Sequence, residues 1–75
     1  MTLRLFTTDE LVRIAAAGGG FRLDANLRPV DDLVRIASAA RAGGATVIFF
    51  GLALRHVDDL VRISSSGRGF VLLED

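Results

Sequence analysis

The polar and apolar positions of one ten-residue stretch recur along the chain. LRHVDDLVRI at residues 54–63 repeats LRPVDDLVRI at residues 27–36 with nine of ten positions identical, and DELVRI at residues 9–14 is a shorter third copy. On a wheel of about 100° per residue, the leucine, valine and isoleucine of each copy fall in one broad arc and the arginine falls opposite. The pattern predicts three amphipathic helices with matching apolar faces.

Start and stop signals flank each predicted helix. Thr7 and Glu10 have the spacing of a capping box, and each copy carries two acids in its first turn, where the helix dipole favours negative charge. Pro29 stands at the Thr7 position in the second copy, so Asp31 is the candidate cap there. Glycines follow the copies, as expected for left-handed C-terminal positions, at residues 18–20, 43–44, 67 and 69.

Short apolar runs before the first helix and after each glycine stop predict strands, at residues 2–6, 21–24, 45–50 and 70–73. Strands joined by single helices pair in parallel through right-handed crossovers. We therefore expect one α/β domain over residues 1–75, with a four-stranded parallel sheet in sequential order and all helices on one face. Three strand–helix repeats, at approximately 1–19, 20–43 and 44–68, and a closing strand at 69–75 would stack as a small solenoid.

FRLDAN at residues 21–26 is similar to the L-x-L-x-x-N strand signature of the leucine-rich repeat class, with Asn26 at the asparagine position. The match covers one repeat, because Ala53 stands where the asparagine would recur. The equivalent leucines Leu11, Leu33 and Leu60 are 22 and 27 residues apart, which resembles the repeat length of that class. The resemblance implies a stacked architecture and a role in binding other proteins.

Strand alternation divides the predicted sheet into two faces. On the face away from the helices, the first two strands are mixed and polar, whereas Ile48, Phe50, Val71 and Leu73 form an apolar row on the last two. Because contiguous exposed apolar surface marks interfaces, these four residues are the predicted interface for self-association, through the sheet face or the C-terminal strand edge. The alternative is that the last two strands belong to the core and that the face assignment is off by one.

Candidate catalytic chemistry is sparse. His56, the only histidine, stands in a turn before a helix whose first turn carries Asp58 and Asp59. The first acid of every copy also precedes an arginine by four residues, which predicts intrahelical ion pairs Asp9–Arg13, Asp31–Arg35 and Asp58–Arg62. That structural role explains all three copies, so we predict no catalytic, cofactor-binding or metal-binding residue and a protein that is not an enzyme. The rival interpretation is an enzyme whose active site forms only between subunits, from aligned aspartates and His56.

Composition narrows the function classes. Nine arginines balance nine acids, so neither nucleic acid nor an anionic membrane has an electrostatic footprint here. Without cysteine, a signal peptide or a run long enough to span a bilayer, we expect a soluble cytoplasmic protein. The sequence thus favours a structural or protein-interaction module whose partner is itself, a homo-oligomer, or another protein. The near-identity of adjacent copies also fits an artificial repeat protein without a natural function, and recent duplication explains it equally well.

Overall fold

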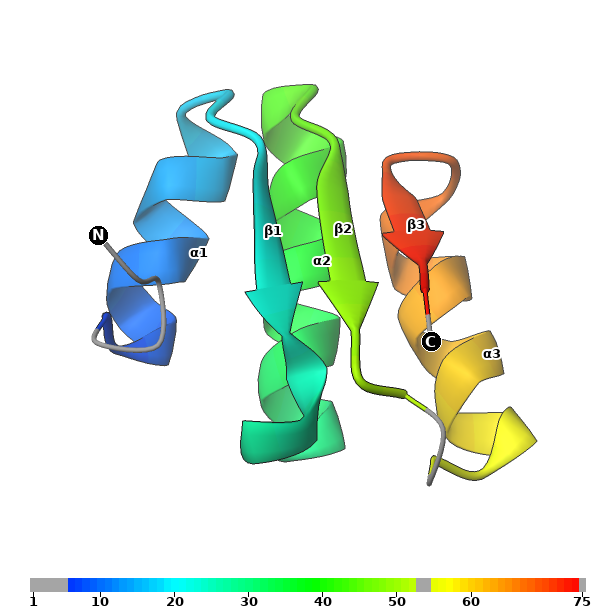
Figure 1. Cartoon of the computed structure of the whole chain (residues 1–75). Helices are drawn as coiled ribbons and strands as arrows, with labels where there is room; N and C mark the ends of the chain where they lie inside the picture. Colours follow the sequence, from blue (N-terminus) through cyan, green and yellow to red (C-terminus); the bar gives the residue numbers. More distant parts are fainter. Residues whose placement is uncertain (1–5, 53–54, 75) are drawn as a thin grey trace.

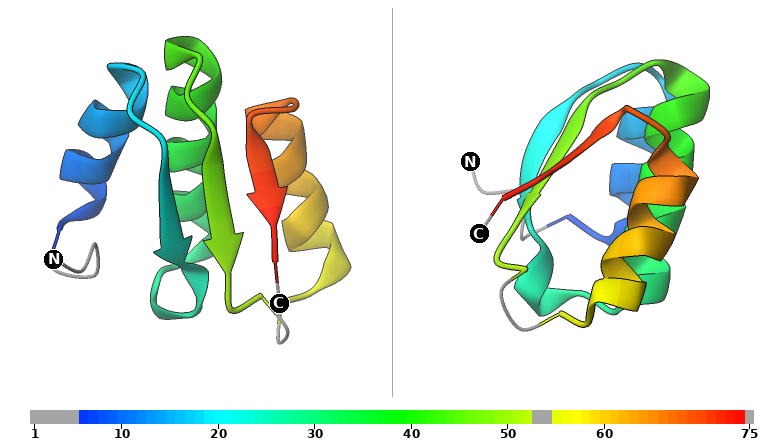
Figure 2. Two further views of the ribbon diagram at one scale, coloured as in Figure 1. Left: turned by 45° about the horizontal axis from the view of Figure 1, so that its top comes forward. Right: turned by 90° about the vertical axis from the view of Figure 1, so that its right-hand side faces the viewer.

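The computed structural model describes residues 6–52 and 55–74. Helices and strands alternate in the order α1 (Thr8–Ala16), β1 (Phe21–Asp24), α2 (Val30–Gly43), β2 (Val47–Phe50), α3 (Val57–Gly67) and β3 (Val71–Leu73), with a 3-10 helix, η2 (Ala25–Leu27), directly after β1 (Figure 1). The strands pair in parallel in the order β1-β2-β3. The helices form one layer against one face of the sheet, and no described helix covers the other face, which we call the open face (Figure 2).

The predicted four-stranded solenoid of strand–helix repeats is wrong. Within residues 6–52 and 55–74 the sheet has three strands, and α1 precedes the first of them. The expected strand at residues 2–6 lies outside the described residues except for Phe6. Phe6 lies in a bend, and its carbonyl oxygen accepts a hydrogen bond of 2.7 Å from Nη2 of Arg28. That bond holds the segment before α1 against the loop before α2. The molecule is compact and measures 29 × 26 × 18 Å.

The three helices begin with different caps. At α1 the capping box is confirmed: Oγ1 of Thr7 accepts from the Glu10 amide at 3.2 Å, and Oε1 of Glu10 accepts from the Thr7 amide at 2.8 Å. At α2 the N-cap is Pro29, which offers no side-chain hydrogen bond, so the predicted cap by Asp31 is wrong. At α3, Nδ1 of His56 accepts from the Asp58 amide at 3.1 Å. The histidine position is therefore part of the helix start.

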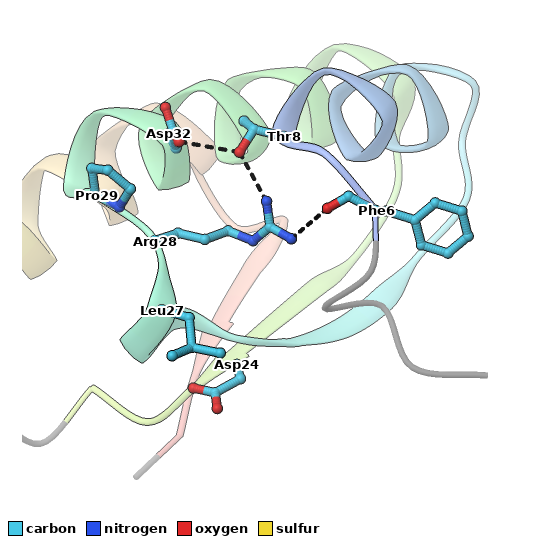
Figure 3. Close-up of a pocket in the computed structure, with 7 residues that line it drawn as sticks. All are labelled: Phe6, Thr8, Asp24, Leu27, Arg28, Pro29 and Asp32. Carbon is cyan, nitrogen blue, oxygen red and sulfur yellow. Dashed lines mark hydrogen bonds between the residues drawn. The ribbon is translucent and has the colours of Figure 1, made fainter.

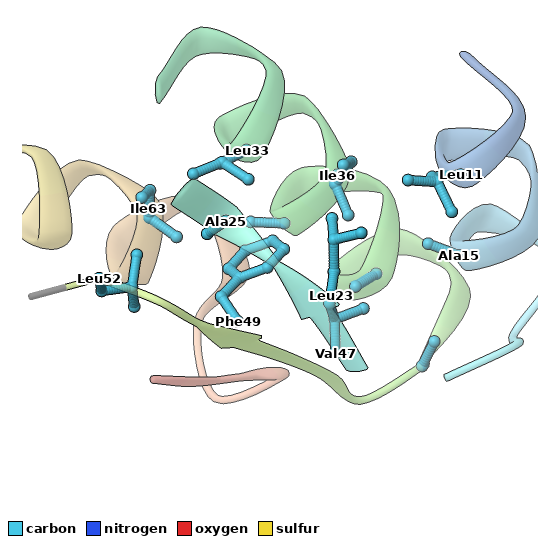
Figure 4. Close-up of a cluster of buried hydrophobic side chains, with 13 residues drawn as sticks. Leu11, Ala15, Leu23, Ala25, Leu33, Ile36, Val47, Phe49, Leu52 and Ile63 are labelled. Atoms are coloured by element: carbon cyan, nitrogen blue, oxygen red, sulfur yellow. The ribbon is translucent and has the colours of Figure 1, made fainter. Parts of the chain in front are cut away.

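The hydrophobic core fills the space between the helix layer and the sheet. Figure 4 shows Phe49 pointing from β2 into this cluster. Along β2 the side chains alternate, with Val47 and Phe49 buried and Ile48 and Phe50 half-buried, as expected for a strand covered on one face. The largest fully buried side chains come from every helix and from β1 and β2: Phe49, Leu11, Leu23, Leu33, Ile36, Ile63 and Val47.

Candidate interaction surface

The strand register separates the four residues of the predicted interface. Val71 pairs with Val47 and Leu73 with Phe49, so Val71 and Leu73 lie on the helix side of the sheet. A Cβ atom added to Gly67 of α3 would overlap Cγ2 of Val71, which agrees with this direction. The assignment of Val71 and Leu73 to the open face is therefore wrong by one residue, because the unbroken apolar run at residues 70–73 carries no polar alternation that reveals its phase.

Ile48 and Phe50 lie on the open face, where the register adds Leu72 beside Ile48. We call Ile48, Phe50 and Leu72 the open-face patch. Leu72 is 53% exposed, and the other two side chains are half-buried. The patch occupies the second and third strands and continues to the edge of the sheet at β3.

One ion pair crosses the open-face patch. Arg22 of β1 places its guanidinium carbon 4.2 Å from the centroid of the Phe50 ring, and its Nη2 lies 2.9 Å from Oε1 of Glu74. The arginine therefore reaches over β2 to the residue after β3 and covers part of Phe50 by a cation–π contact. Ile48 and Leu72 form the more open end of the patch.

The residues of the rival catalytic hypothesis lie at the exposed start of α3. His56 and Asp58 have side chains that are 72% and 85% exposed, with Nδ1 of His56 3.6 Å from Oδ2 of Asp58. Nδ1 is occupied by the hydrogen bond from the Asp58 amide. Both side chains face solvent in the single chain, so a catalytic site built from them needs a second subunit to desolvate them. The contacts of His56 are those of a helix cap.

The ion pairs of the acidic and arginine positions connect helices. Nη2 of Arg35 lies 2.6 Å from Oδ1 of Asp9, and Nη2 of Arg62 lies 3.1 Å from Oδ1 of Asp31. Each arginine thus reaches the preceding helix. The three predicted intrahelical pairs, Asp9–Arg13, Asp31–Arg35 and Asp58–Arg62, are wrong. The hydrogen bond and attraction of Asp9 raise the pKa of Arg35 above its ordinary value. Because the Arg35 guanidinium stays charged well above neutral pH, this pair is expected to persist at neutral pH.

The segment before α1, the loop before α2 and the first turn of α2 enclose a polar pocket of about 260 Å³ (Figure 3). Nη1 of Arg28 donates to Oγ1 of Thr8 at 2.9 Å, and Thr8 donates to Oδ2 of Asp32 at 3.1 Å. The remaining lining residues are Phe6, Asp24, Leu27 and Pro29. Arg28, Thr8 and Asp32 are thus connected by hydrogen bonds that hold the start of α1 against the start of α2. We call such an arginine-centred network a clamp.

A second clamp uses the equivalent arginine of the next copy. Nη2 of Arg55 donates to the carbonyl oxygen of Ala25 at 2.7 Å and to that of Arg28. Arg28 and Arg55 thus each bind the carbonyl of the equivalent position one copy earlier, Phe6 and Arg28 respectively. Sequence reasoning missed both clamps, although a signal exists: Leu-Arg directly precedes the helix-start residue in the second and third copies.

Among residues 6–52 and 55–74, no group of three His, Cys, Asp or Glu side chains is placed to hold a metal ion. In the same part of the chain, no helix combines the length and the apolar character needed to cross a bilayer.

No protein-family model, curated protein or solved structure matches this chain. The resemblance to the leucine-rich repeat class and the cytoplasmic location therefore stay predictions. Function has to be inferred from the surfaces of the molecule itself.

Proposed function

We propose that this protein is a non-enzymatic interaction module that self-associates through the open face and edge of its sheet. The observation that carries the proposal is the open-face patch, in which Leu72 is 53% exposed beside Ile48 and Phe50. Apolar side chains gathered on an uncovered sheet face favour burial against a second sheet. β3 supports the same behaviour, because it is the last strand of the described sheet and its outer edge can pair with another strand.

The charge distribution favours a second copy as the partner. The net charge of zero leaves no long-range repulsion between copies. Among the described residues, the ion pair on the open face is Arg22–Glu74, which lies across the patch and is internally neutral. Asp24 also lies on this face, beside Phe50, and its carboxylate accepts a hydrogen bond from the Asn26 amide at 3.0 Å. Two open faces can therefore meet over the apolar patch with Arg22 and Glu74 paired, which limits the charge that the interface buries.

Light scattering with refractive-index detection tests the proposal, since the chain has no Trp or Tyr to absorb. We expect a mass above the 8.0 kDa of one chain that rises with protein concentration. Leu72→Glu places a charge in the patch and is expected to abolish association through the sheet face, which lowers the measured mass with helicity unchanged.

Ser38→Glu is the matched control. Ser38 is exposed on α2, on the other layer of the molecule, so the same added charge is expected to leave the oligomer intact. A wild-type chain that stays monomeric at millimolar concentration would contradict self-association altogether.

A further inference from the structure

Equivalent positions of the three helices differ in burial according to their place in the helix layer. α1 and α3 lie at its two ends, with α2 between them (Figure 1). Ala15 of α1 and Ala37 of α2 are fully buried, whereas the equivalent Ser64 of α3 is exposed. Val34 of α2 is half-buried, and the equivalent Val61 of α3 is 56% exposed. These positions face the next helix, and in the described part of the chain α3 has none.

The opposite flank shows the complementary difference at α1. Ile36 of α2 and Ile63 of α3 are fully buried, but the equivalent Ile14 of α1 is only half-buried. These positions face the preceding helix, which α1 lacks among the described residues. A hollow of about 400 Å³ lies on this flank, lined by Phe6, Glu10, Arg13, Ile14 and Ala17.

The charges at the two ends are opposite and in register. At both internal junctions an arginine binds the aspartate of the preceding helix, as Arg35–Asp9 and Arg62–Asp31. Each of the three sequence copies carries one such arginine and one such aspartate, but three helices have only two junctions between them. Arg13 of α1 and Asp58 of α3 therefore take part in neither internal junction. In the described structure Arg13 has no acidic partner, and Asp58 meets only His56, at 3.6 Å.

We propose that the side of α3 facing away from α2 in one copy docks against the side of α1 facing away from α2 in a second copy. The helix layer then continues from molecule to molecule. The proposal rests on the proposed self-association and adds a second surface to it. Leu60 and Val61 of one copy pack beside Ile14 of the other. Asp58 of the first copy accepts from Arg13 of the second, which repeats the two internal ion pairs.

Such a contact joins two different surfaces and is therefore heterologous. A heterologous contact closes into a ring or extends as a filament, whereas two copies of one sheet face meet as a closed dimer. Head-to-tail docking accordingly predicts species larger than a dimer. The ion pair is solvent-exposed in the internal junctions, so added salt is expected to weaken the contact between copies.

Charge reversal at the two ends tests the pairing. Arg13→Asp alone sets like charges against each other at every contact between copies, and so does Asp58→Arg alone. Each variant is expected to associate at least about tenfold more weakly than the wild type. In an equimolar mixture, each reversed flank meets an opposite charge on the other variant, so association is expected to return to the wild-type level. Sedimentation velocity with interference optics measures all three samples, and circular dichroism checks that helicity is unchanged.

Arg41→Asp is the matched control, because Arg41 is exposed on the central helix α2 and the proposal gives it no role. Loss of association in both single variants together with recovery in the mixture supports head-to-tail docking. An α3–α3 contact would leave Arg13→Asp unaffected, and a sheet-face contact would leave both variants unaffected. If the single variants associate as the wild type does, or the mixture fails to recover, the inference is overturned, and dissociation by Leu72→Glu then still supports the sheet face. A monomeric wild type overturns the inference and the proposed function together.

Discussion

At the residue scale, His56 shows how one side chain can replace another at a helix start. It follows Arg55 as Pro29 follows Arg28, and the two residues are the N-caps of α3 and α2. Only histidine offers a side-chain acceptor, its Nδ1, to an amide that would otherwise lack a partner inside the helix. The role is local, and it needs neither a subunit partner nor a substrate.

His56→Ala is expected to lower the free energy of unfolding by about 0.5–2 kcal/mol, because it removes the N-cap acceptor of α3. His56→Asn is expected to equal or exceed the wild type, since asparagine is among the best N-cap residues. Urea denaturation followed by far-ultraviolet circular dichroism measures both. If the asparagine variant is as destabilised as the alanine variant, capping is not the role of this side chain.

At the element scale, the ends of α1 and α2 approach each other through Gly43. A Cβ atom at this position would overlap the carbonyl oxygen of Ala15 and lie 2.6 Å from that of Ala16. Both obstacles are backbone atoms, which cannot rotate away as a side chain can. Glycine in the last turn of α2 thus permits contact with the end of α1, and it does so as part of the helix, before the left-handed cap Gly44 with φ of 71°.

Gly43→Ala tests the close approach because two effects have opposite signs. Helix propensity favours alanine over glycine by about 1 kcal/mol, whereas forcing a methyl group into a packed contact costs about 1–3 kcal/mol. We expect net destabilisation in thermal denaturation. Ser38→Ala, on the exposed side of the same helix, is expected to raise the stability slightly by propensity alone. A Gly43→Ala variant more stable than the wild type would contradict the approach of α1 to α2.

At the scale of the whole molecule, 75 residues support one thin core between two layers. Stabilities of about 0.05–0.15 kcal/mol per residue amount to roughly 4–11 kcal/mol for a chain of this length. One large side chain is a substantial share of that total. The sheet face and the outer flanks of α1 and α3, which no described residue covers, contribute to this total only when something else buries them.

Phe49→Ala is expected to cost about 3–5 kcal/mol and to leave the chain largely unfolded near physiological temperature, because the ring is fully buried. Phe50→Ala, one residue along on the open face, is expected to cost no more than about 1–2 kcal/mol. Chemical denaturation of the two variants compares them directly. Equal losses would mean that the two faces of β2 are misassigned.

Much of the fold could be predicted from local signals. The expected strand at residues 21–24 coincides with β1, and those at 45–50 and 70–73 contain β2 and β3. The capping box of Thr7 and Glu10 could also be predicted, because both partners lie within one helical turn. Half of the candidate interaction surface could be predicted. Strand alternation places Ile48 and Phe50 on the correct face of the sheet, whereas it places Val71 and Leu73 on the wrong one.

The sequence by itself determined the three helices, their apolar faces and the runs that contain the three described strands, because these depend on residues a few positions apart. Only the tertiary structure decided the phase of β3, because that phase depends on the pairing of β3 with β2. It also decided which aspartate each arginine binds. The spacing of Asp31 and Arg35 permits an intrahelical pair, but α1 lies close enough for Arg35 to reach Asp9 instead.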